Sequence, residues 1–196
     1  AQLVKGIGVG LAKVGPYCRI LDAVRSALTL PQEPAQRAVL LDMRAMHHLR
    51  LGRPEEALGD IEEALSLVPD HDPLEQGFMH LMHGMVGRAL GWECDRLLAI
   101  FHRARDLTLI EGAPQHVACI DVSIVEARLE AGEPFDRVAR EVSDEAAVEQ
   151  TGGDLGLITA GQLVPPFERA VRELQPGGRS AIFETPYGLH IAERID

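Results

Sequence analysis

The sequence is poor in lysine and in aromatic residues. Both lysines, Lys5 and Lys13, lie near the start of the chain, and aromatic residues make up 4% of the 196 positions. The formal net charge is −11, and the part from Gln115 onward holds 15 acidic residues against 7 arginines. Proteins that bind nucleic acids cluster lysine and arginine to displace the counterions of the phosphate backbone. We therefore expect no nucleic-acid partner.

Long hydrophobic runs are missing as well. A helix that crosses a membrane needs about 18 or more consecutive apolar residues. The apolar N-terminal stretch is interrupted by both lysines and by four glycines. We therefore expect no membrane span.

Cysteine is scarce, with Cys18, Cys94 and Cys119 far apart in the sequence and surrounded by apolar residues. An odd number at such spacing favours buried thiols over a disulfide framework or a zinc site. This pattern favours a reducing compartment, so we expect a cytoplasmic protein. The first residue is not methionine, and an exported form that has lost a signal peptide is the alternative.

What the sequence has in abundance is helical periodicity, above all in its first half. Small or apolar residues recur every three or four positions between Gly52 and Pro69, namely Ala57, Ile61, Ala64 and Leu67. The segment before them, AQRAVLLDMRAMHHLRLG, has an apolar face of its own. The two segments therefore predict an antiparallel helical hairpin across LGRP.

This hairpin pattern repeats along the chain. Ala27 and Ala64 are 37 residues apart, and Ala64 and Ala104 are 40 residues apart, close to the ~34-residue tetratricopeptide period. Residues 1–112 therefore resemble degenerate tetratricopeptide repeats, although alanine and leucine at this spacing also suit any helical bundle. The resemblance implies a groove that binds a protein partner.

The sequence pattern changes near Glu111–Pro114, where glycine and proline break the helical periodicity. We expect a second domain over residues 113–196. Its first segment, HVACI, has β-character, two helical segments follow, and RSAIFETPYGLHIAERID reads as two short strands joined at Pro186-Tyr187-Gly188. The chain as a whole is therefore predicted to be α+β.

The second domain carries an ordered set of short motifs. They are Ser143-Asp144, Gly152-Gly153-Asp154-Leu155-Gly156, Gly161-Gln162, a helix around Phe167, Leu174 followed by Pro176-Gly177, and Thr185 to His190. In this order and spacing the set resembles the parvulin-type rotamase family. The resemblance implies an α+β domain with a small, mostly antiparallel sheet. It also implies a peptidyl-prolyl cis/trans isomerase that acts on proline-containing polypeptide clients, with no cofactor and no metal.

The same resemblance implies which side chains bind substrate. Leu155, Leu163 and Phe167 match positions that line the pocket for the proline ring, while Thr185 and Tyr187 match its edge. Each of these residues also has a purely structural interpretation. Leu163 and Phe167 could belong to the core, and Thr185 and Tyr187 could complete a strand.

Three further residues match catalytic positions of the family. His190 matches one of two histidines near the centre of the sheet, and His116 in HVACI is the candidate for the second. Glu145 stands where the family usually has Asp or Cys beside the substrate carbonyl. Because Glu145 and Tyr187 depart from the usual pattern, the alternative is a non-catalytic chaperone or adaptor that has kept the peptide groove. A repeat scaffold whose C-terminal domain supports assembly is a third interpretation.

The substrate is expected to be unphosphorylated. Recognition of a phosphate dianion before the proline needs Arg or Lys donors. The connection expected after the first strand, Cys119–Ser123, holds one acid and no base, and the nearest cation in sequence is Arg128.

Overall fold

The computed structural model describes residues 21–69, 72–110 and 114–195. The chain divides into two compact units, one ending at Ile120 and the other beginning at Asp121. The domain boundary predicted between residues 112 and 113 lies outside the described residues and stays a prediction. Among the described helices, none has the length and apolar character that a bilayer crossing requires.

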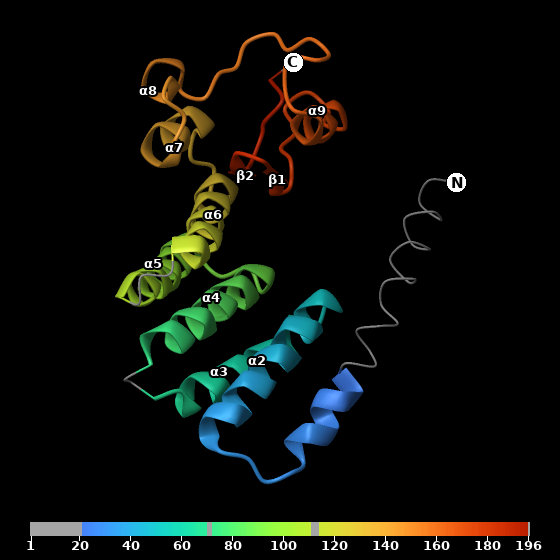
Figure 1. The fold of residues 1–196 in the computed structure, drawn as a ribbon, viewed down its shortest axis with the longest axis vertical. Helices are drawn as coiled ribbons and strands as arrows, with labels where there is room; N and C mark the ends of the chain where they lie inside the picture. Colours follow the sequence, from blue (N-terminus) through green and yellow to red (C-terminus); the bar gives the residue numbers. More distant parts are fainter. Residues whose placement is uncertain (1–20, 70–71, 111–113, 196) are drawn as a thin grey trace, which may run out of the picture. The chain divides into compact units, whose positions relative to one another are not determined.

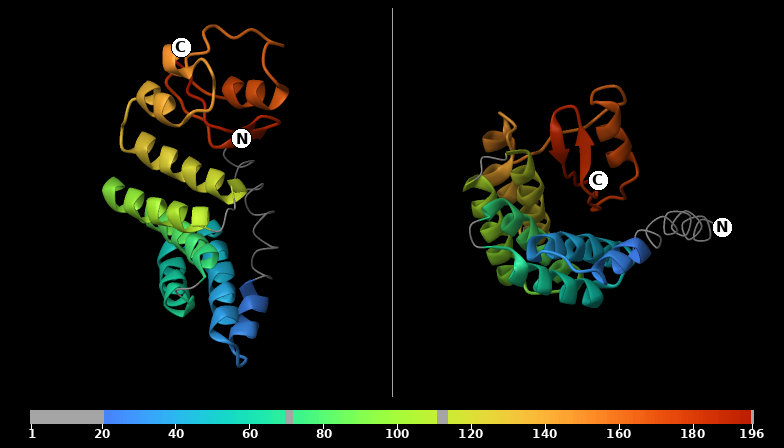
Figure 2. Two further views of the ribbon diagram at one scale, coloured as in Figure 1. Left: turned by 60° about the vertical axis from the view of Figure 1, so that its left-hand side comes forward. Right: turned by 60° about the horizontal axis from the view of Figure 1, so that its bottom comes forward.

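The first unit is a stack of helices (Figures 1 and 2). A helix over residues 21–28 is followed by α2 (Pro34–Arg50), α3 (Pro54–Leu67), α4 (Pro73–Ala89), α5 (Cys94–Ile110) and the start of α6 (Pro114–Glu130). Helix α2 packs on α3 and α4 packs on α5, while α3 joins the two pairs. The predicted helical hairpins are confirmed.

The turn of the α2/α3 hairpin is built by a glycine and a proline. Helix α2 ends before Gly52, which adopts a left-handed φ of 71°, and α3 begins with Pro54. The amide of Arg53 donates to the carbonyl of His48, which satisfies a carbonyl at the helix end. Proline fits the first helical position because the amide lost there has no helical partner.

The same turn recurs twice. Gly91 follows α4 with a φ of 73°, and Gly132 follows α6 with a φ of 87°. In each case the next amide donates back to the helix, from Trp92 to Gly87 and from Glu133 to Arg128. The hairpin pattern therefore extends past residue 112 into α6 and α7 (Phe135–Val142).

Small residues let these helices approach closely. Of the predicted apolar face of α3, Ala57, Ile61 and Ala64 are all at 0% exposure, and Leu67 is half-buried. Helix α4 turns Gly84 toward α5, where a Cβ atom at Gly84 would clash with the fully buried ring of Phe101. The core of this unit is therefore set by small side chains facing larger ones.

The second unit contains the rest of α6, three short helices, α7, α8 (Val148–Thr151) and α9 (Pro165–Arg172), and a β-hairpin. Strand β1 (Phe183–Thr185) pairs antiparallel with β2 (Gly188–His190). Beyond the hairpin the two segments pair again at Arg179 and Glu193. Helix α9 packs against β1, and α7 packs against α8. The predicted α+β class and the small antiparallel sheet are confirmed.

The segment HVACI is not a strand. It lies in α6, which runs without interruption from Pro114 to Glu130. Buried residues recur along α6 at helical spacing, namely Val117, Ile120, Ile124 and Ala127. Five residues of β-character are too few to distinguish a strand from one turn and a half of a buried helix, and the helical period over the longer segment prevails.

The cysteines also differ from expectation. Cys94 is half-buried and Cys119 is exposed, so the prediction of burial is wrong for these two. They form no disulfide with each other. Cys18 lies outside the described residues.

Candidate functional site

Three rings from α9 and the β-hairpin form a cluster in the second unit. Phe167 meets Phe183 edge to face at a centroid distance of 5.1 Å and meets His190 at 5.6 Å. Phe183 and His190 stack at 5.5 Å with an interplanar angle of 24°. We call Phe167, Phe183 and His190 the aromatic cluster; it offers an apolar surface with an imidazole at one side.

The strand register explains why these rings meet. Phe183 on β1 lies directly opposite His190 on β2, so both side chains project from the same face of the hairpin. Thr185, two residues after Phe183, lies on that face too. The turn between the strands places Gly188 at a φ of 140°, which favours glycine.

Thr185 joins the polar side of the cluster. Its Oγ1 lies 2.7 Å from Nε2 of His190, and it also accepts a hydrogen bond from the amide of Tyr187 at 3.1 Å. The Thr185 side chain is buried, with the residue 6% exposed. Because a hydroxyl has one hydrogen and two lone pairs, it can hold the imidazole in either tautomer while it accepts from Tyr187. The imidazole is therefore fixed in orientation.

Leu163 lies just before α9 and is held by Glu168. The Oε1 atom of Glu168 accepts hydrogen bonds from the amides of Gly161 at 2.5 Å and Leu163 at 3.3 Å. Helix α9 starts with two prolines, whose missing amides cost nothing at a helix start. Leu163 and Phe167 are both half-buried. Glu168 therefore ties the Leu163 loop to the helix that carries Phe167.

Three of the expected site residues are exposed. Leu155 is 43% exposed and Tyr187 is 83% exposed. Glu145, between α7 and α8, is also exposed, and its amide donates to the Ser143 hydroxyl. Among the described residues, no hydrogen bond, ion pair or ring contact joins these three side chains to the aromatic cluster.

The strand position predicted for His116 is wrong. His116 lies in α6 and in the first unit, whereas His190 lies on β2 in the second unit. A residue in a helix does not occupy a position on a strand of the sheet. The catalytic role of His116 stays a prediction without the strand position on which it was based.

Phe183 is the member of the cluster that the sequence interpretation did not single out. The sequence did contain a signal for Phe183. Phe183 and Thr185 are two residues apart on one strand, and residues two apart on a strand share a face. Among the described residues there is no group of three or more histidine, cysteine, aspartate or glutamate side chains that could hold a metal ion. The groups that the site does offer are the rings of the aromatic cluster and the Thr185 hydroxyl beside the His190 imidazole.

Comparison with known proteins identifies the C-terminal part of the chain. The family model described as "Rotamase: PPIC-type PPIASE domain" matches residues 118–196. These residues form a PPIC-type PPIase domain. The match includes the aromatic cluster, Glu145 and Leu155, and it begins two residues after His116.

Curated relatives of the PPIase domain carry the names of folding helpers. The chain is 36% identical over 86 residues to chaperone SurA of Nitrosococcus oceani, a match that covers 44% of this chain and 20% of the relative. It is 42% identical over 69 residues to chaperone SurA of Thiobacillus denitrificans, covering 35% and 16%. It is 39% identical over 76 residues to foldase protein PrsA of Oceanobacillus iheyensis, covering 39% and 25%.

The chain thus spans a quarter or less of the length of these relatives. No solved structure matches it significantly. The comparisons support a parvulin-type folding helper. They give no support to the cytoplasmic localisation, which stays a prediction beside the exported alternative.

Proposed function

We propose that this protein is a peptidyl-prolyl cis/trans isomerase that assists the folding or maturation of polypeptide clients. The observation that carries the proposal is the aromatic cluster next to the Thr185–His190 hydrogen bond, inside a domain of the PPIC type. In this proposal Phe167 and Leu163 contact the proline ring of the client. Thr185 and His190 form the polar side near the carbonyl.

The chemistry requires only binding. An X-Pro bond rotates over a barrier of about 18–20 kcal/mol because amide resonance is lost in the twisted state. A site that binds the twisted amide better than either planar form lowers this barrier without a covalent step. Each ~1.4 kcal/mol of such preference gives a tenfold rate increase, so a few modest contacts are sufficient.

The roles that we propose for the exposed site residues follow from their exposure. Leu155, Tyr187 and Glu145 have exposed side chains, so a client segment can reach them. We place Leu155 and Tyr187 at the rim of the proline pocket and Glu145 beside the client carbonyl. The helical hairpins of the first unit hold a second part of the same client.

The test is a protease-coupled isomerisation assay with a short unphosphorylated Ala-Pro peptide. Wild-type protein should accelerate isomerisation, and Phe167→Ala should lower kcat/KM about tenfold because one wall of the pocket is lost. The matched control is Phe135→Ala, which truncates a half-buried ring on α7 outside the cluster. Thermal unfolding is measured on both variants to check that they are folded. An equal rate for wild type and Phe167→Ala would contradict the proposed pocket.

A non-catalytic chaperone or adaptor is the second candidate. It is favoured by the helical position of His116, which leaves His190 as the one expected histidine that lies on the described sheet. In that case the protein binds the Ala-Pro peptide, for instance by fluorescence anisotropy, and Phe167→Ala weakens binding, while the isomerisation rate equals the uncatalysed rate.

A further inference from the structure

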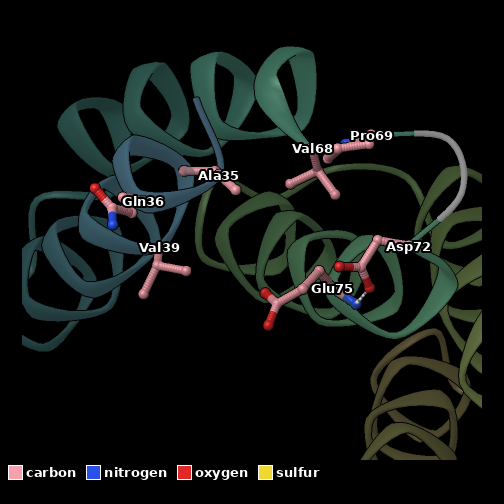
Figure 3. Close-up of a pocket in the computed structure, with 8 residues that line it drawn as sticks. Ala35, Gln36, Val39, Val68, Pro69, Asp72 and Glu75 are labelled. Atoms are coloured by element: carbon pink, nitrogen blue, oxygen red, sulfur yellow. Dashed lines mark hydrogen bonds between the residues drawn. The ribbon is translucent and has the colours of Figure 1, made fainter. Parts of the chain in front are cut away.

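The first unit has a groove between α2 and α4. A cavity of about 390 Å³ is lined by both helices, among them Val39, Asp42 and Met46 of α2 and Glu75, Phe78 and Met85 of α4. A second cavity of about 240 Å³ shares Val39 and Glu75 with the first and continues toward Asp72. Figure 3 shows Val39 and Glu75 of this second cavity extending into the space between the two helices. We call the two cavities together the α2–α4 groove.

Methionine gathers in this groove. All five methionines of the sequence lie on α2 and α4, and four of them line the larger cavity, namely Met46, Met79, Met82 and Met85. Methionine is unbranched and polarizable, so it adapts to side chains of different shape. Surfaces that bind varied peptide segments use it for this reason.

Two carboxylates, Asp42 and Glu75, and one cation, Arg50, interrupt the apolar lining of the larger cavity. Asp42 of α2 and Glu75 of α4 are both half-buried, and both line the larger cavity. Burial of Asp42, and in addition the nearby charge of Glu75, raise the pKa of Asp42 to about 6. Among the described residues, neither carboxylate forms an ion pair with an arginine or histidine. A half-buried pair of like charges costs stability unless a cation neutralises it. Arg50 follows Asp42 by eight residues on α2, about two helical turns, so it lies at a different level of the groove. The part of the groove around Asp42 and Glu75 is therefore complementary to a ligand with a positive charge.

We propose that the α2–α4 groove binds an apolar polypeptide segment that carries a lysine or arginine. The cationic group lies between Asp42 and Glu75, and apolar side chains of the segment pack against Met46, Phe78 and Met85. This inference rests on the proposed role of the helical hairpins in holding a client, and it names the chemistry of that client segment. The chain itself is acidic, so basic segments are also attracted to it at long range.

The test is anisotropy of a short labelled peptide of leucine, alanine and lysine, added to the full chain at low salt. Glu75→Gln should weaken binding at least several-fold, and the double change Asp42→Asn with Glu75→Gln at least tenfold. Glu55→Gln removes one charge from an exposed position on α3, and it should leave the affinity unchanged. The same peptide with glutamate in place of lysine should bind far more weakly than the lysine peptide.

The apolar half of the groove has a matched pair of variants. Met85 lines the cavity and is 40% exposed, while Met43 on α2 is 41% exposed and is not part of the lining. Met85→Ala should weaken binding several-fold, and Met43→Ala should not. Because both side chains are exposed, neither truncation leaves a large cavity in the core.

Three results would overturn the proposal. The first is equal binding of the lysine and glutamate peptides, and the second is an equal loss of affinity in Glu55→Gln and Glu75→Gln. The third is occupation of the groove by a different segment. A second copy of the chain in the groove would be seen as self-association that Glu75→Gln abolishes. The chain's own residues 1–20 in the groove would be seen as peptide binding that occurs only after these residues are deleted. Isomerisation of the short Ala-Pro peptide is measured on the same variants. If the protein binds the lysine peptide but does not isomerise the Ala-Pro peptide, the proposed enzyme activity is rejected and the proposed groove stands. If it isomerises the Ala-Pro peptide but does not bind the lysine peptide, only the proposed groove is rejected.

Discussion

At the scale of single residues, ionised Asp42 lowers the stability of the folded protein, and the same residue has the proposed binding role. Burial and the Glu75 charge raise its pKa from 3.8 to about 6. The folded state therefore holds this proton more tightly than the unfolded chain, and stability falls as pH rises from about 4 to about 6. Above that range the folded protein keeps the full cost of a half-buried carboxylate.

Asp42→Asn should remove this cost. We expect the variant to be more stable than wild type at pH 8 by about 1–3 kcal/mol, because one pKa unit corresponds to ~1.4 kcal/mol. At pH 4 the difference should nearly vanish. Urea unfolding monitored by Trp92, the single tryptophan of the sequence, measures the first unit. A stability gain that is the same at both pH values would contradict the assignment.

At the scale of the element, the close approach of α4 and α5 depends on glycine. An alanine in a helix is favoured over glycine by up to about 1 kcal/mol, but a Cβ at Gly84 meets the fully buried Phe101 ring, which has no space to move. Overpacking of this kind costs about 1–3 kcal/mol. The clash therefore outweighs the gain in helix propensity.

Gly84→Ala should destabilise the first unit by up to about 2 kcal/mol in urea unfolding, which is the overpacking cost less the propensity gain. The matched control is Gly59→Ala on α3, where a Cβ meets nothing within 4 Å. That variant should be more stable by about 0.5–1 kcal/mol. If Gly84→Ala were as stable as Gly59→Ala, the helices would have room to separate.

The elements show how far the sequence alone could predict this structure. The hairpins α2/α3 and α4/α5 and the β-hairpin followed from periodicity and from their glycine and proline boundaries. The motif order identified Phe167, Thr185 and His190, which the structure brings together. The segment at His116 failed because its period was ambiguous over five residues.

The α2–α4 groove had no sequence signal. Asp42 and Glu75 lie on helices separated in sequence by the whole of α3, and they meet because α2 and α4 also contact each other directly. Such a meeting depends on how hairpins stack, which periodicity within one helix does not determine.

At the scale of the whole molecule, charge limits the choice of substrate. Arg128, the cation expected nearest to the site, donates to Glu133 and Glu141 at 2.8 and 2.6 Å, and these hydrogen bonds raise its pKa. The segment Cys119–Ser123 lies within α6 and is not the loop that was expected there. Four more arginines of this unit have a carboxylate within 4.0 Å, namely Arg137, Arg140, Arg172 and Arg179.

A phosphate before the proline should therefore give no advantage. We expect kcat/KM for a phosphoserine-Pro peptide to be equal to or lower than that for the matched Ser-Pro peptide, because five of the seven arginines of this unit already lie beside carboxylates and the unit is acidic. The difference should shrink as salt is added. A clear preference for the phosphorylated peptide would require a basic site elsewhere in the chain.

The recurring glycine turns also bear on biosynthesis. Each turn connects two helices that are consecutive in sequence, so the hairpins α2/α3 and α4/α5 need only residues that have already been translated. Contacts of short sequence separation form rapidly, and domains generally fold in the order in which they leave the ribosome. The first unit can therefore assemble while the PPIase domain is still being synthesised.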